Sequence, residues 1–156
     1  MEAVAESAGV SKGTVYATFG TRQELIDEMT ILGLQQSEQA FRAAAESAAP
    51  TWEALVDVVT QPQAVFFARP DVSAPDATDN RVHDAFMRAR DAFGLLLHRG
   101  QQEGLLRQDI TIDHIQVLFH GMYLALGEYS VERLADIRQC AEVILRGLLV
   151  LPTEHR

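Results

Sequence analysis

The sequence has one cysteine, no long apolar run and no excess of basic residues, and each scarcity excludes a class of protein. Cys140 is the only cysteine, so no disulfide can form within the chain. The longest apolar segment, from Val117 to Leu126, is interrupted by His120 and Gly121 and falls short of the roughly 18–20 residues that a membrane-spanning helix needs. The first residues have no basic region and no long apolar stretch, so they are not a signal peptide. Together these features predict a cytoplasmic protein with no membrane partner.

Acidic residues outnumber basic ones, with 22 Asp and Glu against 13 Lys and Arg and a net charge of −9. This balance argues against a protein that coats nucleic acid nonspecifically, although it allows a small DNA-reading head on an acidic body. Ala, Leu, Glu, Gln and Arg are abundant, whereas alternating β-branched residues are scarce. We therefore predict an all-α fold, and 156 residues are enough for a small head and a larger body.

The residues that usually carry catalysis or bind metals form no recognisable pattern. No two of the histidines are four residues apart, the spacing at which one helix presents a metal-binding pair. A glycine-rich phosphate loop is absent from the sequence, and Cys140 is interpreted as a packed residue of the last helix rather than a nucleophile. The sequence therefore predicts no enzyme, no metal site and no cofactor. The histidines are His83, His98, His114, His120 and His155.

Capping residues and apolar periodicity divide the chain into helices. Ser11 is a good N-cap for a helix that ends near Phe19. Thr21 and Glu24 have the spacing of a capping box, which predicts a long helix reaching about Ser47. The apolar face of this long helix is predicted to follow Leu25, Ile26, Met29, Leu32, Gln36 and Ala40.

The rest of the chain has the same helical character, apart from one irregular stretch. Thr51 and Thr111 are predicted to open two further helices, and the 3.6-residue apolar period predicts others over 81–104 and 132–149. Residues 68–80 contain two prolines and three aspartates, so this segment is predicted to be a loop, with a lid over a ligand entrance as the alternative.

The first 25 residues have the layout of a helix-turn-helix, in which a short helix, a glycine-containing turn and a second short helix precede a capped long helix. Ala5, Ala8 and Val10 are predicted to pack the two short helices together. Val15 and Phe19 are predicted to anchor the second helix to the body.

The other side of the second helix carries groups suited to DNA. Hydroxyl groups can bond phosphates or base edges, and a lysine or arginine can neutralise a phosphate. Tyr16 offers both a ring and a hydroxyl group. The start of the long helix adds a basic side chain and free backbone N–H groups. The predicted DNA-binding residues are Ser11, Lys12, Thr14, Tyr16, Thr18, Thr21 and Arg22.

This segment resembles the second half of the helix-turn-helix of the TetR family of transcriptional regulators. The matching residues are Ala5, Ala8-Gly9-Val10-Ser11, Gly13-Thr14-Val15-Tyr16, Phe19, Arg22 and Leu25. Thr18 stands where the family often has His, and Arg22 stands where it often has Lys. The resemblance implies a partial helix-turn-helix DNA-binding domain over residues 1–24 and a helical effector-binding and dimerisation domain over residues 25–156.

In the TetR family, another helix precedes the segment that begins at Met1 in this sequence. Without that helix, Val4, Ala5, Val15 and Phe19 lose part of their cover, and lost packing of this kind can cost several kcal/mol. Either Met1 is an internal methionine of a longer reading frame, which we favour, or the chain is a truncated variant. For the 156-residue chain itself we predict weak or absent specific DNA binding.

The resemblance also implies an effector pocket inside the helical body and a dimer interface on its last two helices. Aromatic and methionine side chains would line the pocket, with His120 and Tyr123 best suited to orient a ligand. The pocket candidates are Phe66, Phe67, Phe86, Met87, Phe93, His120 and Tyr123. The interface candidates are Leu118, Phe119, Met122, Leu126, Ile137, Ala141, Ile144 and Leu148.

Two functions remain open from the sequence. The first is a ligand-responsive transcriptional regulator, a repressor that binds double-stranded operator DNA as a homodimer and is released by a small, largely apolar effector. The alternative is a helical module that dimerises and binds ligand but no longer binds DNA, because the first helix is missing.

Overall fold

A computed structural model describes residues 1–61, 64, 67, 80–127 and 134–150. The predicted all-α fold is confirmed, because every regular element in these ranges is a helix apart from one isolated bridge between Leu106 and Leu149. The predicted loop at 68–80 lies outside the described residues, except for its last residue. The helices are α1 (Glu2–Ala8), α2 (Lys12–Phe19), α3 (Arg22–Glu46), α4 (Thr51–Thr60), α7 (Asn80–Gln102), α8 (Ile112–Gly127) and α9 (Leu134–Arg146).

The helix boundaries in the N-terminal part are those that the capping residues predict. The Ser11 hydroxyl accepts a hydrogen bond of 3.0 Å from the backbone N–H of Thr14 and so caps α2. Thr21 and Glu24 form both bonds of the capping box that opens α3. Gly9 ends α1 with a φ of 66°, a conformation that glycine adopts without steric cost.

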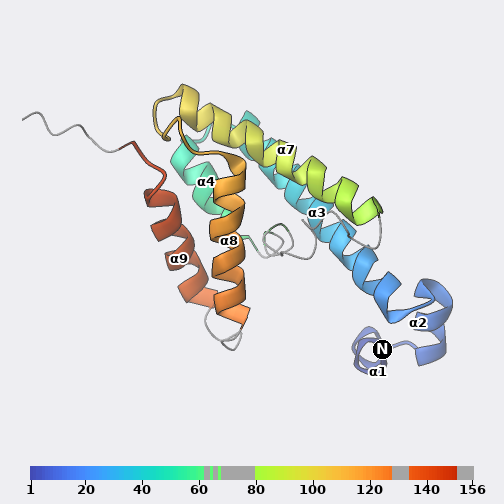
Figure 1. Cartoon of the computed structure of the whole chain (residues 1–156). Coiled ribbons are helices and arrows are strands. Elements are labelled where there is room, and N and C mark those ends of the chain that lie inside the picture. The colour runs from blue at the N-terminus through green and yellow to red at the C-terminus, as the bar shows by residue number, and fades with distance from the viewer. Residues whose placement is uncertain (62–63, 65–66, 68–79, 128–133, 151–156) are drawn as a thin grey trace, which may run out of the picture.

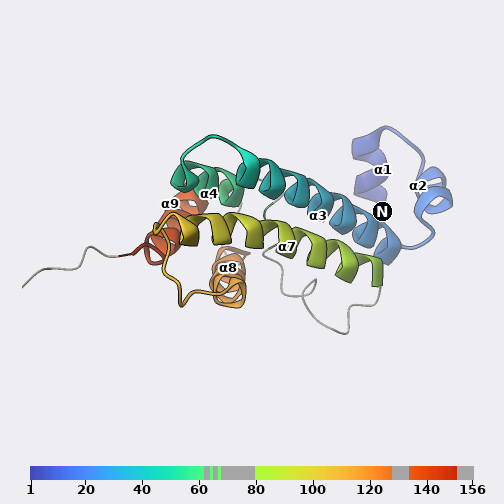
Figure 2. The ribbon, with the colours of Figure 1, turned by 90° about the horizontal axis from the view of Figure 1, so that it is seen from above.

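Two long helices, α3 and α7, lie side by side and run in the same direction along the molecule (Figures 1 and 2). The short helices α1 and α2 sit at the N-terminal end of α3, and α4, α8 and α9 gather toward the other end (Figure 1). No helix in the described ranges combines the length and the hydropathy needed to cross a membrane.

The C-terminal ends of α3 and α7 are tied together by Arg99. Its guanidinium donates to the backbone carbonyls of Ser47 at 2.8 Å and Ala49 at 2.7 Å, and it also reaches the carbonyls of Ala44 and Ala45. Ala44 and Ala45 lie in the last turn of α3, and Ser47 and Ala49 follow it, so no further turn of α-helix supplies N–H donors from four residues later. Arg99 therefore satisfies the end of one helix from the last turn of its neighbour.

The buried face of α3 differs from the predicted one. Met29 and Leu32 are 54% and 56% exposed. The buried stripe instead includes Thr30, Leu34 and Ser37 and continues to Phe41. Its two hydroxyl groups each donate to the backbone carbonyl four residues earlier, so they are buried without an unmet hydrogen bond. Small side chains at these positions let α7 pack closely against α3.

The described residues form two separate apolar clusters. The smaller one, at the head, buries Ala5, Val15 and Leu25, with Met1 and Phe19 packed against it. The larger one fills the body between α3, α4, α7, α8 and α9. Because α3 contributes to both clusters, the division between residues 24 and 25 stays a prediction.

The packing of the head departs from the prediction at two positions. Ala8 is exposed, and Val10 is 43% exposed, so neither packs the two short helices together. Val4 is also 40% exposed. The contact between α1 and α2 therefore depends on Ala5 and Val15, which are both buried.

Candidate nucleic-acid interface and body sites

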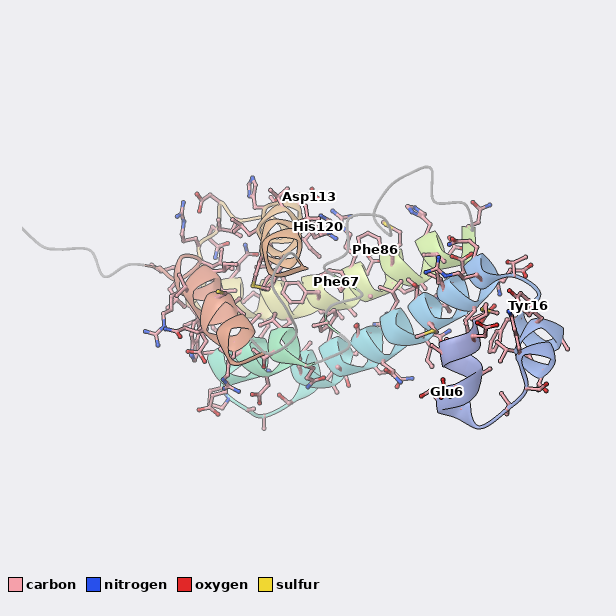
Figure 3. All side chains as sticks on the ribbon, turned by 90° about the horizontal axis from the view of Figure 1, so that it is seen from below. Glu6, Tyr16, Phe67, Phe86, Asp113 and His120 are labelled. Atoms are coloured by element: carbon pink, nitrogen blue, oxygen red, sulfur yellow. The ribbon has the colours of Figure 1, made fainter. Side chains whose placement is uncertain are left out.

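The second helix, α2, is held to the head on one side only. Val15 is 4% exposed and Phe19 is half-buried, and both face the apolar cluster of the head. The seven predicted DNA-binding residues are all exposed. In Figure 3, Tyr16 lies on α2 at the end of the molecule opposite α9. The structure thus leaves one surface of a short, anchored helix open to solvent.

Helical geometry arranges this open surface in three parts. Lys12 and Tyr16 are four residues apart and form one flank, and Thr14 and Thr18 form the other. Gly13 and Ala17 lie between the flanks and opposite Val15, and both are exposed. Neither was among the predicted DNA-binding residues, because small apolar residues carry no hydrogen-bonding group of their own, although Gly13 is part of the family resemblance. Their value is steric, since they would let the backbone of α2 approach a groove closely.

Several polar groups on this surface already have partners in the structure. The hydroxyl oxygens of Ser11 and Thr14 are 2.8 Å apart and share a hydrogen bond. The Thr18 hydroxyl donates to the carbonyl of Thr14 at 2.9 Å. The Lys12 ammonium donates to the Glu2 carboxylate at 2.7 Å in an exposed ion pair. A DNA phosphate would have to compete with Glu2 for Lys12.

A hollow of about 440 Å³ opens where the head meets the body. It lies between the end of α2, the first turns of α3 and the start of α7. In the lining of this hollow, the Arg81 guanidinium donates to the Glu28 carboxylate at 2.7 Å. This ion pair links α7 to α3 near the end of α2. The lining residues are Thr18, Phe19, Gly20, Glu24, Glu28 and Arg81.

The predicted effector-pocket residues form part of an aromatic cluster in the body. Phe67 stacks on Phe86 with ring centroids 5.7 Å apart, and Phe93 meets Phe41 edge-on at 5.1 Å. All four rings are at most 5% exposed, so they pack against one another in this structure. Figure 3 shows Phe67 and Phe86 near the α8 helix that carries His120.

The remaining pocket candidates are less buried or undescribed. Met87 and His120 are half-buried. Phe66 lies outside the described residues, and only the backbone of Tyr123, within α8, is described. The pocket therefore stays a prediction.

The last two helices, α8 and α9, expose apolar side chains, but few of these belong to the residues predicted for the dimer interface. Phe119, Ala141 and Leu148 were expected at a dimer interface, but they are at most 6% exposed because they face the core of their own chain. Ile144 and Met122 are half-buried, and the side chains of Leu126 and Ile137 are not described.

Most of the exposed apolar residues on α8 and α9 are not among those predicted for the dimer interface. We call this surface the α8–α9 face, and it consists of Val117, Leu118, Leu124 and Val143, with exposed fractions of 70%, 44%, 57% and 66%. Among these four, only Leu118 was predicted from the sequence. The two helices that carry these four residues lie side by side in Figure 1.

A helix-turn-helix that projects from a helical body is the architecture of transcriptional regulators of the helix-turn-helix class. Comparison with known proteins gives the family. Residues 1–29 match the N-terminal model of bacterial regulatory proteins of the tetR family. Residues 75–150 match the model of the SbtR-like transcriptional regulator C-terminal domain.

A relative with an assigned name covers most of the chain. The HTH-type transcriptional regulator NfxB from Pseudomonas aeruginosa is 33% identical over 141 residues, which are 85% of this chain and 72% of NfxB. The chain therefore belongs to the TetR family of transcriptional regulators, and this family is one of regulators rather than enzymes.

Solved structures support the fold. The TetR regulator SCO0520 from Streptomyces coelicolor has a TM-score of 0.64 and 24% identity, and the match covers 97% of this chain and 87% of that one. The TetR-family regulator PfmR from Thermus thermophilus has a TM-score of 0.61 and 22% identity, over 92% and 83% of the two chains.

Proposed function

We propose that the chain is a homodimeric repressor that reads operator DNA through α2 and is released by a small, largely apolar effector bound in the body. The observation that carries DNA reading is the exposure of all seven predicted contact residues around a helix anchored by Val15. In this proposal Gly13 and Ala17 allow close approach to the major groove. Lys12 and Arg22 contact phosphates, and Tyr16 contacts a sugar, base or phosphate.

Dimerisation is supported by the α8–α9 face. Val117 and Leu124 are seven residues apart, two turns along one side of α8, and Val143 lies on the neighbouring α9. Exposed aliphatic side chains clustered on adjacent helices are typical of an interface rather than of a solvated surface. Pairing of the α8–α9 face with the same face of a second copy would bury these side chains. It would also fix the distance between the two α2 helices of the dimer.

Effector response requires that the ligand binds one arrangement of the heads more tightly than the other. The connection between body and head supports such a coupling. Arg81 at the start of α7 pairs with Glu28 of α3, and both line the hollow beneath α2. A ligand-induced shift of α7 would therefore act on α3 next to the reading helix.

The DNA-reading part is tested by selecting duplexes from a random-sequence library with the 156-residue chain and measuring affinity by fluorescence anisotropy. For a selected duplex, Lys12→Ala should weaken binding to all sequences alike and lower the slope of affinity against salt by about 1. Arg107→Ala, which removes a basic side chain between α7 and α8, should leave both unchanged. Equal effects of the two variants would contradict a phosphate contact by Lys12.

Dimerisation is tested by light scattering on the same chain. Val143→Lys should convert the dimer to a monomer, because it places a charge within the α8–α9 face. Leu95→Lys is the matched control, because Leu95 is a 48% exposed apolar residue on α7, outside that face. A monomeric wild type, or loss of the dimer in both variants, would argue against the proposed interface.

A second candidate function is favoured by the small cluster of the head. It buries only Ala5, Val15 and Leu25 fully, while Val4 and Val10 are exposed. A head packed this lightly supports the alternative of a module that dimerises and binds ligand without reading DNA. Failure to select any duplex by a chain that remains dimeric would favour this alternative.

A further inference from the structure

One buried amide in the body has a donor without an acceptor. Gln116 on α8 is 8% exposed, and its Nε2 atom has no hydrogen-bond partner within the part of the chain that the structure describes. Burying an amide N–H₂ group without an acceptor costs free energy, so most buried amides in proteins are paired. A bound molecule that brings an acceptor to this buried atom would satisfy the donor.

The orientation of the Gln116 amide is set by Arg90 on α7. The Arg90 Nε–H donates to the Gln116 Oε1 atom at 3.3 Å. A guanidinium has donors only, so the amide oxygen, rather than the nitrogen, must face it. The open Nε2 donor is therefore fixed by its neighbour and does not depend on an arbitrary choice between two amide orientations.

The charge of Arg90 is already balanced. Its terminal nitrogen donates to the Asp113 carboxylate at 2.5 Å. Asp113 lies one turn before Gln116, in the first turn of α8 (Figure 3). Because the pair is neutral as a whole, the site offers a hydrogen-bond donor without a net positive charge.

The surface of α7 beside this group is not filled by the described chain. Gly94 follows Arg90 by one turn and is only partly buried. Apart from its chain neighbours and its own helix backbone, no atom of the described residues lies within 4 Å of the position that a Cβ would occupy. Met87 precedes Arg90 by one turn and is half-buried against the apolar core. Arg90, which holds the Gln116 amide, thus stands on α7 between a residue with open space beside it and a residue that packs against the apolar core.

We propose that the strip where α7 meets α8 binds a small molecule with a neutral carbonyl oxygen and an apolar body. The carbonyl accepts from the Gln116 Nε2 atom, and the apolar part lies against Met87 and the neighbouring core. This inference rests on the proposed effector response and narrows it, because it names the polar group that an otherwise apolar effector carries.

Three probes of similar size test the chemistry on the whole 156-residue chain by NMR titration. Acetophenone has the neutral carbonyl, ethylbenzene lacks it, and benzoate replaces it with a charge. Acetophenone should bind about tenfold more tightly than ethylbenzene, the factor expected for one buried hydrogen bond, and more tightly than benzoate. Equal affinities, no binding of acetophenone, or tighter binding of benzoate would overturn the proposal.

The variant Gln116→Leu tests whether the preference for acetophenone depends on Gln116. It should abolish the difference between acetophenone and ethylbenzene and leave the unfolding temperature of the free protein nearly unchanged, because removal of the unpaired donor offsets loss of the 3.3 Å hydrogen bond from Arg90. Gln101→Leu is the control, because the Gln101 Nε2 atom donates to the carbonyls of Arg107 and Ile110. That variant should lower the unfolding temperature.

The outcomes separate this inference from the proposed repressor function. A lower unfolding temperature of Gln116→Leu with an unchanged acetophenone preference would make Gln116 a structural residue and overturn the site. The titrations contain no DNA, so a failure of DNA reading leaves their result intact. A carbonyl preference that Gln116→Leu removes supports the site even if no duplex is selected.

Discussion

The Lys12 ammonium and the Glu2 carboxylate form an ion pair of 2.7 Å that joins α2 to α1 across the turn of the helix-turn-helix. Lys12 is the only lysine in the sequence, and residues 1–24 contain three acidic residues against two basic ones. The proposed DNA-reading surface therefore contains its own competitor for a phosphate. Glu2 is 82% exposed on its side chain, so it can release Lys12 at little cost.

Glu2→Gln is predicted to strengthen DNA binding by up to about fivefold, because it removes the carboxylate that competes with phosphate, and exposed pairs are worth at most about 1 kcal/mol. The effect should shrink as salt is added. Anisotropy titrations with a nonspecific duplex measure it. Glu6→Gln is the matched control, since Glu6 is exposed one turn further along α1, and an equal gain from that variant would show a general charge effect instead.

Arg99→Met is predicted to lower the free energy of unfolding by about 2–3 kcal/mol, because it leaves backbone carbonyls at the end of α3 without a charged donor. Methionine keeps most of the apolar stem, so the loss reports on the hydrogen bonds. Urea denaturation measures the change. Arg88→Met on the same helix removes a partly exposed pair with Glu38 at 3.4 Å. It should cost less than about 1 kcal/mol, because Glu38 keeps its pair with Arg42. Similar losses in the two variants would contradict the capping role.

Glu103, just after α7, accepts hydrogen bonds from Arg99 of α7 and from Thr51 of α4. Hydrogen bonds from Thr51 and then Arg99 hold the pKa of Glu103 below its ordinary value of 4.5. Because its pKa is lower in the folded state, the carboxylate stabilises the fold above pH 4.5, and this contribution is lost as the pH falls through the folded-state pKa.

Glu103→Gln should therefore lower the unfolding temperature at neutral pH, and the gap to the wild type should narrow progressively below pH 4.5. Thermal melts across this pH range measure the gap. Glu53→Gln on α4 serves as the control, because it removes one exposed acidic side chain from the same part of the molecule. A gap for Glu103→Gln that is constant with pH would show that charge at Glu103 does not matter.

The sequence predicted the features that depend on neighbouring residues along the chain. Ser11 and Thr21 cap α2 and α3 as expected, because each capping bond spans only three residues. The same holds for Thr111, whose hydroxyl accepts from the backbone of His114 at 3.4 Å at the start of α8. Local hydrogen bonding therefore sufficed to place most helix boundaries.

Features that depend on packing between distant helices were harder to predict. Thr30 and Ser37 are polar by residue type but buried in α3, because their hydroxyl groups bond to their own helix. Nearly all of α8 is apolar, so periodicity alone could not tell that Phe119 faces the core while Val117 faces outward. Which side of α8 is buried depends on α7 and α9, which pack against it and come from other parts of the sequence.

The two glycines of α7 are predicted to respond to alanine in opposite directions. A Cβ at Gly100 would lie 2.6 Å from Cδ1 and 2.8 Å from Cγ of Leu106, which is itself 1% exposed. The carbonyl of Gly100 also accepts from the backbone N–H groups of Leu105 and Leu106, so the turn after α7 cannot move away freely. Gly100→Ala should therefore lower the free energy of unfolding by about 1–3 kcal/mol, the usual cost of overpacking.

Gly94 lies in the middle of the same helix, and no atom of the described residues, apart from its chain neighbours and its own helix backbone, lies within 4 Å of the Cβ position. Gly94→Ala should raise the free energy of unfolding by about 0.5–1 kcal/mol, because alanine restricts the unfolded chain and favours the helix. Urea denaturation of the two variants, in the absence of ligand and DNA, gives both signs in one experiment. Changes of the same sign would show that helix propensity, rather than the contact with Leu106, governs both sites.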